Sequence, residues 1–282
     1  MMAFYVAYLG SIITIQPISN TFLPFRYIPL YGNVGRNTLL SVRNMQSSRS
    51  INKVIFHDPQ DRQAQGNSLP VERDIILSKI SWALAEIESK ENHWSGTFQD
   101  ATSGKVKDTR LWSIKRDAAQ YLKELILQNQ YSSILEFGTS AGYSTLHLAE
   151  ACLRTHGTID TIERDPQKIQ LAQFYFDAIQ SGSLITLHEG DIPSVLSSQL
   201  KNRKFDFIFI DGAQEEYPKY LNLALEHLSP YKGTIVADNV ISHADALAPF
   251  FNAVAKLQRY TVSKLPIGSG LLRINQIISP NT

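Results

Sequence analysis

The sequence is poor in cysteine and in net charge. Its 282 residues include one cysteine, Cys152, so no disulfide can form within the chain. Cys152 lies among apolar residues in a predicted helix, which favours a buried, inert thiol over a catalytic nucleophile. The 27 Lys and Arg residues nearly balance the 26 Asp and Glu residues. No overall field therefore favours nucleic acid, and only a local basic patch would bind it.

Long apolar runs are absent as well. No stretch reaches the roughly 18–20 residues that a membrane-spanning helix needs. The opening residues 1–15 are apolar, but Gly10, Ser11 and Thr14 interrupt them and no Lys or Arg precedes them. The segment thus lacks the charged start of a secretory signal. We expect a cytoplasmic protein without a membrane-embedded part.

Acidic residues are missing from residues 1–57, which carry five basic ones, and residues 41–50 are rich in serine. This bias is typical of an organellar transit peptide. A flexible extension, or coding sequence assigned upstream of a true start at Met45, explains it equally well. Residues 58–69 are polar and read as a linker. We predict an N-terminal extension over residues 1–69, flexible or targeting, and one domain over residues 70–282.

The periodicity of the second part predicts an α/β fold. Apolar residues at helical spacing predict helices at about 71–89 and 115–128. Helical segments separate most of the predicted strands, which lie at about 132–137, 158–163, 184–188, 204–210, 232–237, 259–263 and 270–277. Nearly continuous apolar runs in two of these strands are typical of parallel strands covered on both faces. We therefore expect a seven-stranded, mostly parallel sheet with helices on both faces.

The first of these strands leads into a glycine turn. Gly138 and Gly142 allow a sharp turn and a close approach of the backbone to a ligand. A dinucleotide site would need a further glycine where the backbone meets a pyrophosphate, and Ser140 stands there instead. Because S-adenosylmethionine (SAM) has no phosphate, the spacing favours SAM over NAD. A tight turn without a ligand is the alternative.

Acidic residues follow at the ends of the next two strands. Glu163 lies about twenty residues after the glycine turn, where a carboxylate can accept hydrogen bonds from both ribose hydroxyls. Asp165 precedes Pro166, which predicts a helix N-cap. Asp191 would either accept the adenine amino group or cap the next helix, and the sequence does not separate these roles.

A candidate metal site lies at the ends of the fourth and fifth strands, which are followed by Asp211 and by Asp238-Asn239. The carboxyl ends of parallel strands meet at one edge of a sheet, so these side chains should converge. Two carboxylates and an amide oxygen suit Mg²⁺. Neighbouring side chains in a strand point to opposite faces, so Asp238 and Asn239 can share an ion only if the strand ends there. Otherwise these residues merely cap loops and helices.

Together, these segments resemble the metal-dependent O-methyltransferases, which include catechol and caffeoyl-CoA O-methyltransferases. The resemblance covers roughly residues 71–282 and rests on the glycine turn, Glu163, the segment from Asp211 to Tyr217, and Asp238-Asn239. It implies a Rossmann-like class I SAM methyltransferase fold and a homodimer. It also implies that Asp211, Asp238 and Asn239 bind a divalent cation. The residues expected at the SAM site are Glu136, Gly138, Ser140, Gly142, Ser144, Glu163, Asp191 and Asp211.

One position departs from the family pattern. Members usually carry a lysine three residues after the first metal-binding aspartate, where it is taken as the general base, and this chain has Gln214 there. An amide cannot remove a proton at neutral pH, so Gln214 would only position an acceptor hydroxyl. His243 is a candidate substitute base, and a solvated or capping histidine is the alternative.

The expected reaction is methyl transfer from SAM to a small, catechol-like acceptor bound through Mg²⁺. Trp94, Phe98 and Trp112 would form an aromatic wall for a planar acceptor, or would only pack against the sheet. One alternative is methylation of a hydroxylated uridine in tRNA, which needs a basic patch. Another is a SAM-binding protein that has lost catalysis, as Gln214 suggests. The candidates for the basic patch are Arg110, Lys115, Arg116, Lys201, Arg203 and Lys204.

Overall fold

The computed structural model describes residues 3–9, 12–18, 69–91, 97–99, 106–108, 110–230 and 232–277. The chain divides into two compact units, Met1–Asn67 and Ser68–Thr282. In the first unit, β1 (Ala3–Leu9) and β2 (Ile12–Ile18) pair as an antiparallel hairpin. The predictions of a transit peptide, a flexible extension or an upstream start concern a segment that lies largely outside the described residues.

The second unit contains a seven-stranded sheet with the order β10-β11-β9-β8-β5-β6-β7. Strand β11 (Leu271–Gln276) is antiparallel to both of its neighbours, β9 and β10 (Tyr260–Leu265). The other strands pair in parallel: β5 (Ser133–Phe137), β6 (Thr158–Glu163), β7 (Ile185–Glu189), β8 (Phe207–Ile210) and β9 (Thr234–Ala237). The prediction of a mostly parallel, seven-stranded sheet is confirmed.

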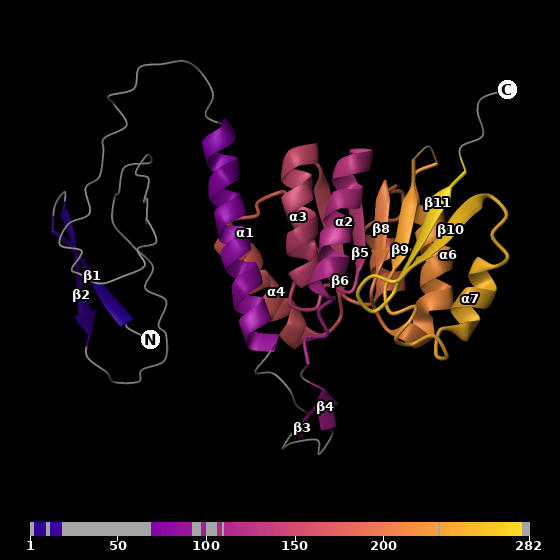
Figure 1. The fold of residues 1–282 in the computed structure, drawn as a ribbon, viewed down its shortest axis with the longest axis horizontal. Coiled ribbons are helices and arrows are strands. Elements are labelled where there is room, and N and C mark those ends of the chain that lie inside the picture. The colour runs from indigo at the N-terminus through magenta and orange to yellow at the C-terminus, as the bar shows by residue number, and fades with distance from the viewer. Residues whose placement is uncertain are drawn as a thin grey trace. The chain divides into compact units, whose positions relative to one another are not determined.

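Helices cover the two faces of this sheet (Figure 1). One hydrophobic cluster joins the sheet to α1 (Leu69–Glu91), α2 (Arg116–Asn129), α3 (Tyr143–Thr155) and α4 (Pro166–Ile179). The other joins it to α5 (Ile192–Ser198), α6 (Tyr217–His227) and α7 (Ala248–Val254).

Strand β8 shows why its sequence is apolar throughout. Phe207 and Phe209 belong to the first cluster, while Ile208 and Ile210 belong to the second, and all four are fully buried. A strand covered on both faces has no side that water can reach, so the usual alternation of apolar and polar residues is lost.

Two details differ from the sequence prediction. Strand β8 begins later than expected, because Phe205 forms only an isolated bridge with Leu228. A short antiparallel hairpin, β3 (Thr97–Gln99) and β4 (Val106–Asp108), forms between the first two predicted helices, where no strand was predicted. Among the described residues, no helix is both long and apolar enough to cross a membrane.

Candidate cofactor and metal site

A pocket of about 680 Å³ lies at the carboxyl ends of the parallel strands. The turns after β5, β6, β7, β8 and β9 line it, together with the segment that precedes α2. The structure thus brings together residues as far apart in the sequence as Leu111 and Ser269. The predicted site residues in its wall are Gly138, Ser140, Ser144, Glu163, Asp191, Asp211, Gln214, Asp238, Asn239 and His243.

The glycine turn provides one wall of this pocket. Gly138 has φ +99°, and a Cβ there would collide with the backbone carbonyl oxygen of Asp211. Only glycine therefore lets the turn after β5 lie against the end of β8. Gly142, which we expected at the SAM site, does not line the pocket. It precedes α3 with φ +86°, and a Cβ would lie 2.8 Å from the Phe176 ring, so its role is in the turn itself.

Glu136 also lies behind the pocket rather than in its wall. Its side chain is fully buried and accepts hydrogen bonds from Ser144 Oγ at 2.5 Å, Thr145 Oγ1 at 2.5 Å and Thr161 Oγ1 at 2.6 Å. Burial raises the pKa of Glu136 to about 7, although the three hydroxyl donors oppose this rise. Glu136 is thus a buried hub that joins β5, β6 and α3. It lies close to the expected SAM site, and a role there stays a prediction.

Glu163 lies at the end of β6, facing the glycine turn. One of its carboxylate oxygens accepts a hydrogen bond from Ser140 N at 2.8 Å, and the other accepts bonds from Arg164 N and Asp165 N at 2.9 Å each. The carboxylate is therefore held at the pocket wall in a fixed orientation. A carboxylate in this position can accept hydrogen bonds from a ribose.

Asp165, which was predicted to be a cap, and Asp191, whose role was left between cap and ligand, are both helix caps. Asp165 accepts hydrogen bonds from the backbone of the first turn of α4, as predicted. Asp191 Oδ1 accepts a bond from Ser194 N at 3.1 Å and caps α5. Hydrogen bonds to Ser194 lower the pKa of Asp191, which keeps it charged. Asp191 also lines the pocket, so capping does not remove it from the wall.

The two aspartates and the asparagine of the predicted metal site lie together. Strand β9 ends at Ala237, and Asn239 has φ +68°, a left-handed conformation that turns the chain away from the strand. Asp238 and Asn239 are therefore released from strand geometry, which is the condition that sharing an ion required. Asn239 Nδ2 donates a hydrogen bond to Asp211 Oδ1 at 2.9 Å.

Electrostatics indicate that these residues fit a cation. Asp238 is 2% exposed, and its Oδ1 atom has no hydrogen-bond partner. Burial, and then the charge of Asp238, raise the pKa of Asp211 well above its ordinary value. Burial likewise raises the pKa of Asp238 to about 6. Buried carboxylates that repel each other and retain an oxygen without a donor are stabilised by a hard cation with oxygen ligands.

The third oxygen of such a site would come from an amide. Within the described part of the chain, no three His, Cys, Asp or Glu side chains gather so that they could hold a metal ion. The set formed by Asp211, Asp238 and Asn239 is therefore a partial shell of the kind that leaves positions open for water or substrate oxygens.

The two predicted catalytic residues, Gln214 and His243, both line the pocket. Gln214 lines the pocket and begins a short 3₁₀ helix, Gln214–Glu216. His243 is exposed at the pocket, and its Nδ1 atom lies 2.9 Å from Ser242 Oγ. The backbone N–H of His243 donates a hydrogen bond to the Asn239 carbonyl at 3.0 Å, so His243 closes the turn that follows Asp238.

Sequence reasoning missed two parts of the site. The first is Tyr217, which is fully buried near Asp211 and Asn239 and was recognised only as part of a motif. Burial, and then the charge of Asp211, raise the pKa of Tyr217. The segment before α2, residues 111–115, forms a whole wall. Its signals in the sequence were Trp112, one of three suggested aromatic residues, and Lys115, one of the suggested basic-patch residues. Trp94 and the side chain of Phe98 lie outside the described part of the chain.

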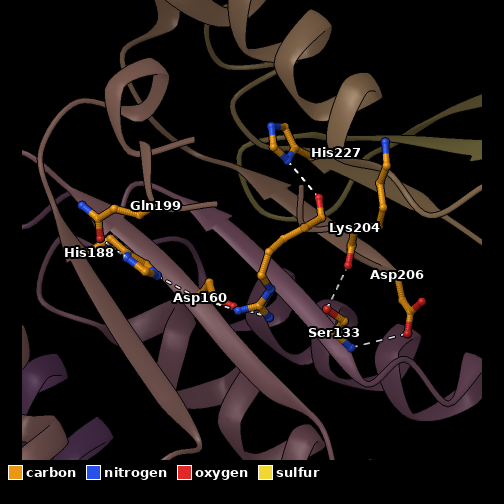
Figure 2. A network of polar contacts seen from close by, with 8 residues as sticks. Ser133, Asp160, His188, Gln199, Lys204, Asp206 and His227 are labelled. Atoms are coloured by element: carbon orange, nitrogen blue, oxygen red, sulfur yellow. Dashed lines mark hydrogen bonds and ion pairs between the residues drawn. The ribbon is translucent and has the colours of Figure 1, made fainter. Parts of the chain in front are cut away.

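The predicted basic turn at residues 201–204 is largely engaged in internal contacts. Arg203 pairs with Asp160 at 2.9 Å, and Lys204 Nζ donates to the Glu226 carbonyl at 2.5 Å. Figure 2 shows Asp160 and His188 in the same network, where their side chains are 2.8 Å apart. The turn precedes β8 and so lies at the amino ends of the strands, opposite the pocket.

Comparison with known proteins agrees with this architecture. Residues 86–279 match the family described as O-methyltransferase. A catechol O-methyltransferase of Niastella koreensis is 36% identical over 138 residues, or 48% of this chain and 61% of that protein. A catechol O-methyltransferase of Mycobacterium tuberculosis is 29% identical over 142 residues, or 50% of this chain and 63% of that protein. The matched region thus spans less than two thirds of either relative.

Solved structures share the fold. An O-methyltransferase of Bacillus cereus in complex with SAH superposes with a TM-score of 0.57 and 21% identity, over 69% of this chain and 90% of that one. The O-methyltransferase TomG of Streptomyces achromogenes, in complex with SAM, gives a TM-score of 0.54 and 20% identity, over 78% and 94% of the two chains. On its fold and on the family match over most of its length, the chain belongs to the O-methyltransferase family.

Proposed function

We propose that this chain is a SAM-dependent and divalent-metal-dependent O-methyltransferase that methylates one of two adjacent hydroxyl groups on a small, catechol-like acceptor. The observation that carries the proposal is the pair of buried carboxylates, Asp211 and Asp238, in the same pocket as the glycine turn. Membership of the O-methyltransferase family supports the reaction type. The catechol acceptors named for two relatives support the substrate class.

The β5–β6–β7 side of the pocket would bind SAM. Gly138 leaves room for the cofactor against the backbone, and Glu163 presents a fixed carboxylate for the ribose hydroxyls. Asp191 stands at the wall near the start of α5 and would accept a hydrogen bond from the adenine. These residues fix where the sulfonium lies relative to the other half of the pocket, and such positioning accounts for a large part of the barrier in a two-substrate reaction.

The β8–β9 side would bind the acceptor through a cation. Asp211, Asp238 and Asn239 would hold a divalent ion such as Mg²⁺, whose charge favours the phenolate form of a bound hydroxyl. A free phenol titrates near pH 10, and each unit by which its pKa falls corresponds to about 1.4 kcal/mol. Gln214 has no proton-accepting group at neutral pH, so its role is to orient the second hydroxyl by hydrogen bonding.

The test is methyl transfer from SAM to a panel of catechols, with and without EDTA. We expect methylated product only in the presence of a divalent cation, and restoration of activity when Mg²⁺ is added back. Full activity after chelation would contradict the metal role. SAM binding by calorimetry without turnover on any acceptor would instead favour a protein that has lost catalysis, as the amide at position 214 suggests.

The oligomeric state is a separate part of the proposal. The family resemblance implies a homodimer, and the chain exposes large apolar side chains on the α1–α4 side: Ile75 is 40% exposed, Trp82 45% and Phe174 51%. Apolar side chains that gather on one surface mark protein contacts. Light scattering at several concentrations should give twice the mass of one chain.

A further inference from the structure

Trp112 is exposed and has an unfavourable backbone conformation. Its side chain is 55% exposed in the pocket wall, and its φ is +54°. A bulky residue in the left-handed region is destabilised, and such residues persist where the surroundings hold them in place, often at ligand sites. A tryptophan that only filled the core would be buried, and this one is not.

The residues on either side of Trp112 are anchored. The carbonyl of Leu111 accepts a hydrogen bond from Ser140 Oγ of the glycine turn, and Ser113 N donates to Glu91 Oε1 at 2.8 Å. Leu111 and Ile114 are 2% and 5% exposed. The backbone is therefore fixed both to the glycine turn and to α1, on either side of the exposed Trp112.

Cationic side chains lie on the same segment. The Arg110 guanidinium lies 3.8 Å from the centroid of the Trp112 ring, in cation–π contact. Lys115 lines the pocket three residues further on. The carboxylates of the predicted metal site belong to the β8–β9 side. The pocket thus has an acidic end, which suits a cation, and an aromatic wall that carries positive charge.

We propose that Trp112 positions the acceptor by packing against its planar ring, and that Arg110 and Lys115 give preference to acceptors with an anionic substituent such as a carboxylate. This inference rests on the proposed function and names the acceptor class of the same pocket. The acceptor's adjacent hydroxyls point to the β8–β9 end, and its substituent points toward the segment before α2.

The test compares two acceptors with the same pair of hydroxyls, catechol and 3,4-dihydroxybenzoate. Trp112→Gly removes the ring, and it suits the positive φ, so we expect an unchanged or higher melting temperature. For both acceptors KM should rise about tenfold, in line with the loss of one well-packed aromatic contact. SAH affinity should stay the same, and Trp112→Phe should restore most of the acceptor affinity. Val262→Ala, at an exposed apolar residue of β10 that does not line the pocket, is the control and should leave KM unchanged.

The charge preference is tested with Arg110→Gln and Lys115→Gln. Each should lower kcat/KM for 3,4-dihydroxybenzoate several-fold and leave catechol unaffected, with Lys201→Gln as the control at an exposed lysine far from the pocket. Equal effects on both acceptors would overturn the charge preference. A Trp112→Gly variant with the KM of the wild type would overturn the positioning role.

Acceptor binding to the complex with SAH and Mg²⁺, measured by calorimetry, separates this inference from the proposed function. Acceptor binding without turnover would contradict the proposed reaction, and the loss of that binding in Trp112→Gly would still support the positioning role. Turnover with no difference between Trp112→Gly and Val262→Ala would overturn this inference alone. If neither acceptor binds to the wild-type complex, the inference fails.

Discussion

The buried carboxylates on the two sides of the pocket differ in their hydrogen-bond partners. On the β5–β6–β7 side, Glu136 is fully buried and three hydroxyl groups donate hydrogen bonds to it. On the β8–β9 side, Asp238 is almost as deeply buried, yet its Oδ1 atom has no donor. The protein thus supplies donors to both oxygens of the first carboxylate and leaves one oxygen of the second without a partner.

This difference separates support from ligand binding. A buried acid whose two oxygens both accept hydrogen bonds from the protein is stabilised within the fold without a ligand. A buried acid without donors destabilises the fold unless something else neutralises it, and that cost is consistent with a site kept for a ligand. We therefore expect Glu136 to stabilise the fold and Asp238 to bind the cation that the reaction needs. The following substitutions test these two roles.

The largest effect is expected for Asp238→Asn. This change keeps the shape of the side chain and removes its charge, so kcat/KM should fall about a thousandfold because metal-assisted stabilisation is lost. SAH affinity, measured by calorimetry, should not change. Asp245→Asn, at an exposed aspartate seven positions after Asp238, is the control. If SAH affinity falls in parallel with activity, Asp238 supports the fold as Glu136 does, and its proposed role as a cation ligand is contradicted.

Glu136→Ala should mainly affect stability. The change leaves three buried hydroxyls without an acceptor, so urea unfolding should show a loss of about 3 kcal/mol. Glu136→Gln retains an acceptor oxygen and should lose less. The comparison would be wrong if Glu136→Ala unfolded like the wild type but failed to bind SAH, because the carboxylate would then contact the cofactor directly.

His147 is a third buried titratable group. It has no hydrogen-bond partner, like the Oδ1 atom of Asp238, but it does not line the pocket. It is 7% exposed, neither ring nitrogen has a hydrogen-bond partner, and burial lowers its pKa to about 4. The unfolded chain, with a pKa near 6.5, takes up this proton first as the pH falls. The resulting contribution to stability is complete above about pH 6.5 and is lost progressively down to about pH 4, by up to about 3 kcal/mol.

We therefore expect His147→Phe to flatten the pH dependence of the free energy of unfolding between pH 6.5 and 4, with activity unchanged. Exposed His156, replaced by Asn to suit its positive φ, is the control. An unaltered pH profile in His147→Phe would show that this imidazole is protonated normally in the folded protein.

The smallest effect is expected for Gln214→Lys, which restores the residue usual in the family. An added base near the acceptor should raise kcat about tenfold at high pH, a modest gain if the cation already favours the phenolate. A loss of activity would instead show that the amide of Gln214 makes a hydrogen bond that a lysine cannot replace.

The sequence predicted the sheet well, because buried parallel strands such as β8 have a distinctive apolar pattern. It also predicted which residues would meet at the carboxyl ends, since the ends of parallel strands share one edge. It could not separate residues in the pocket wall from residues behind it, such as Glu136 and Gly142, which do not line the pocket. That distinction depends on side-chain partners such as Thr161, which come from other strands.

The segment before α2 was harder to predict for a physical reason. Trp112 has a backbone conformation that its own residue type disfavours, and Ser140 and Glu91 hold its neighbours in place from distant parts of the chain. No local pattern encodes such contacts. The sequence therefore suggested Trp112 as an aromatic residue of interest but not as part of an anchored wall.

The most direct test of the account is calorimetric titration of Mg²⁺ into the metal-free protein saturated with SAH. We predict one Mg²⁺ bound per chain in the wild type, no detectable binding in Asp238→Asn, and wild-type binding in the control Asp245→Asn. Binding that is equal in all three proteins, or absent from the wild type, would contradict the claim that Asp211, Asp238 and Asn239 form a cation site.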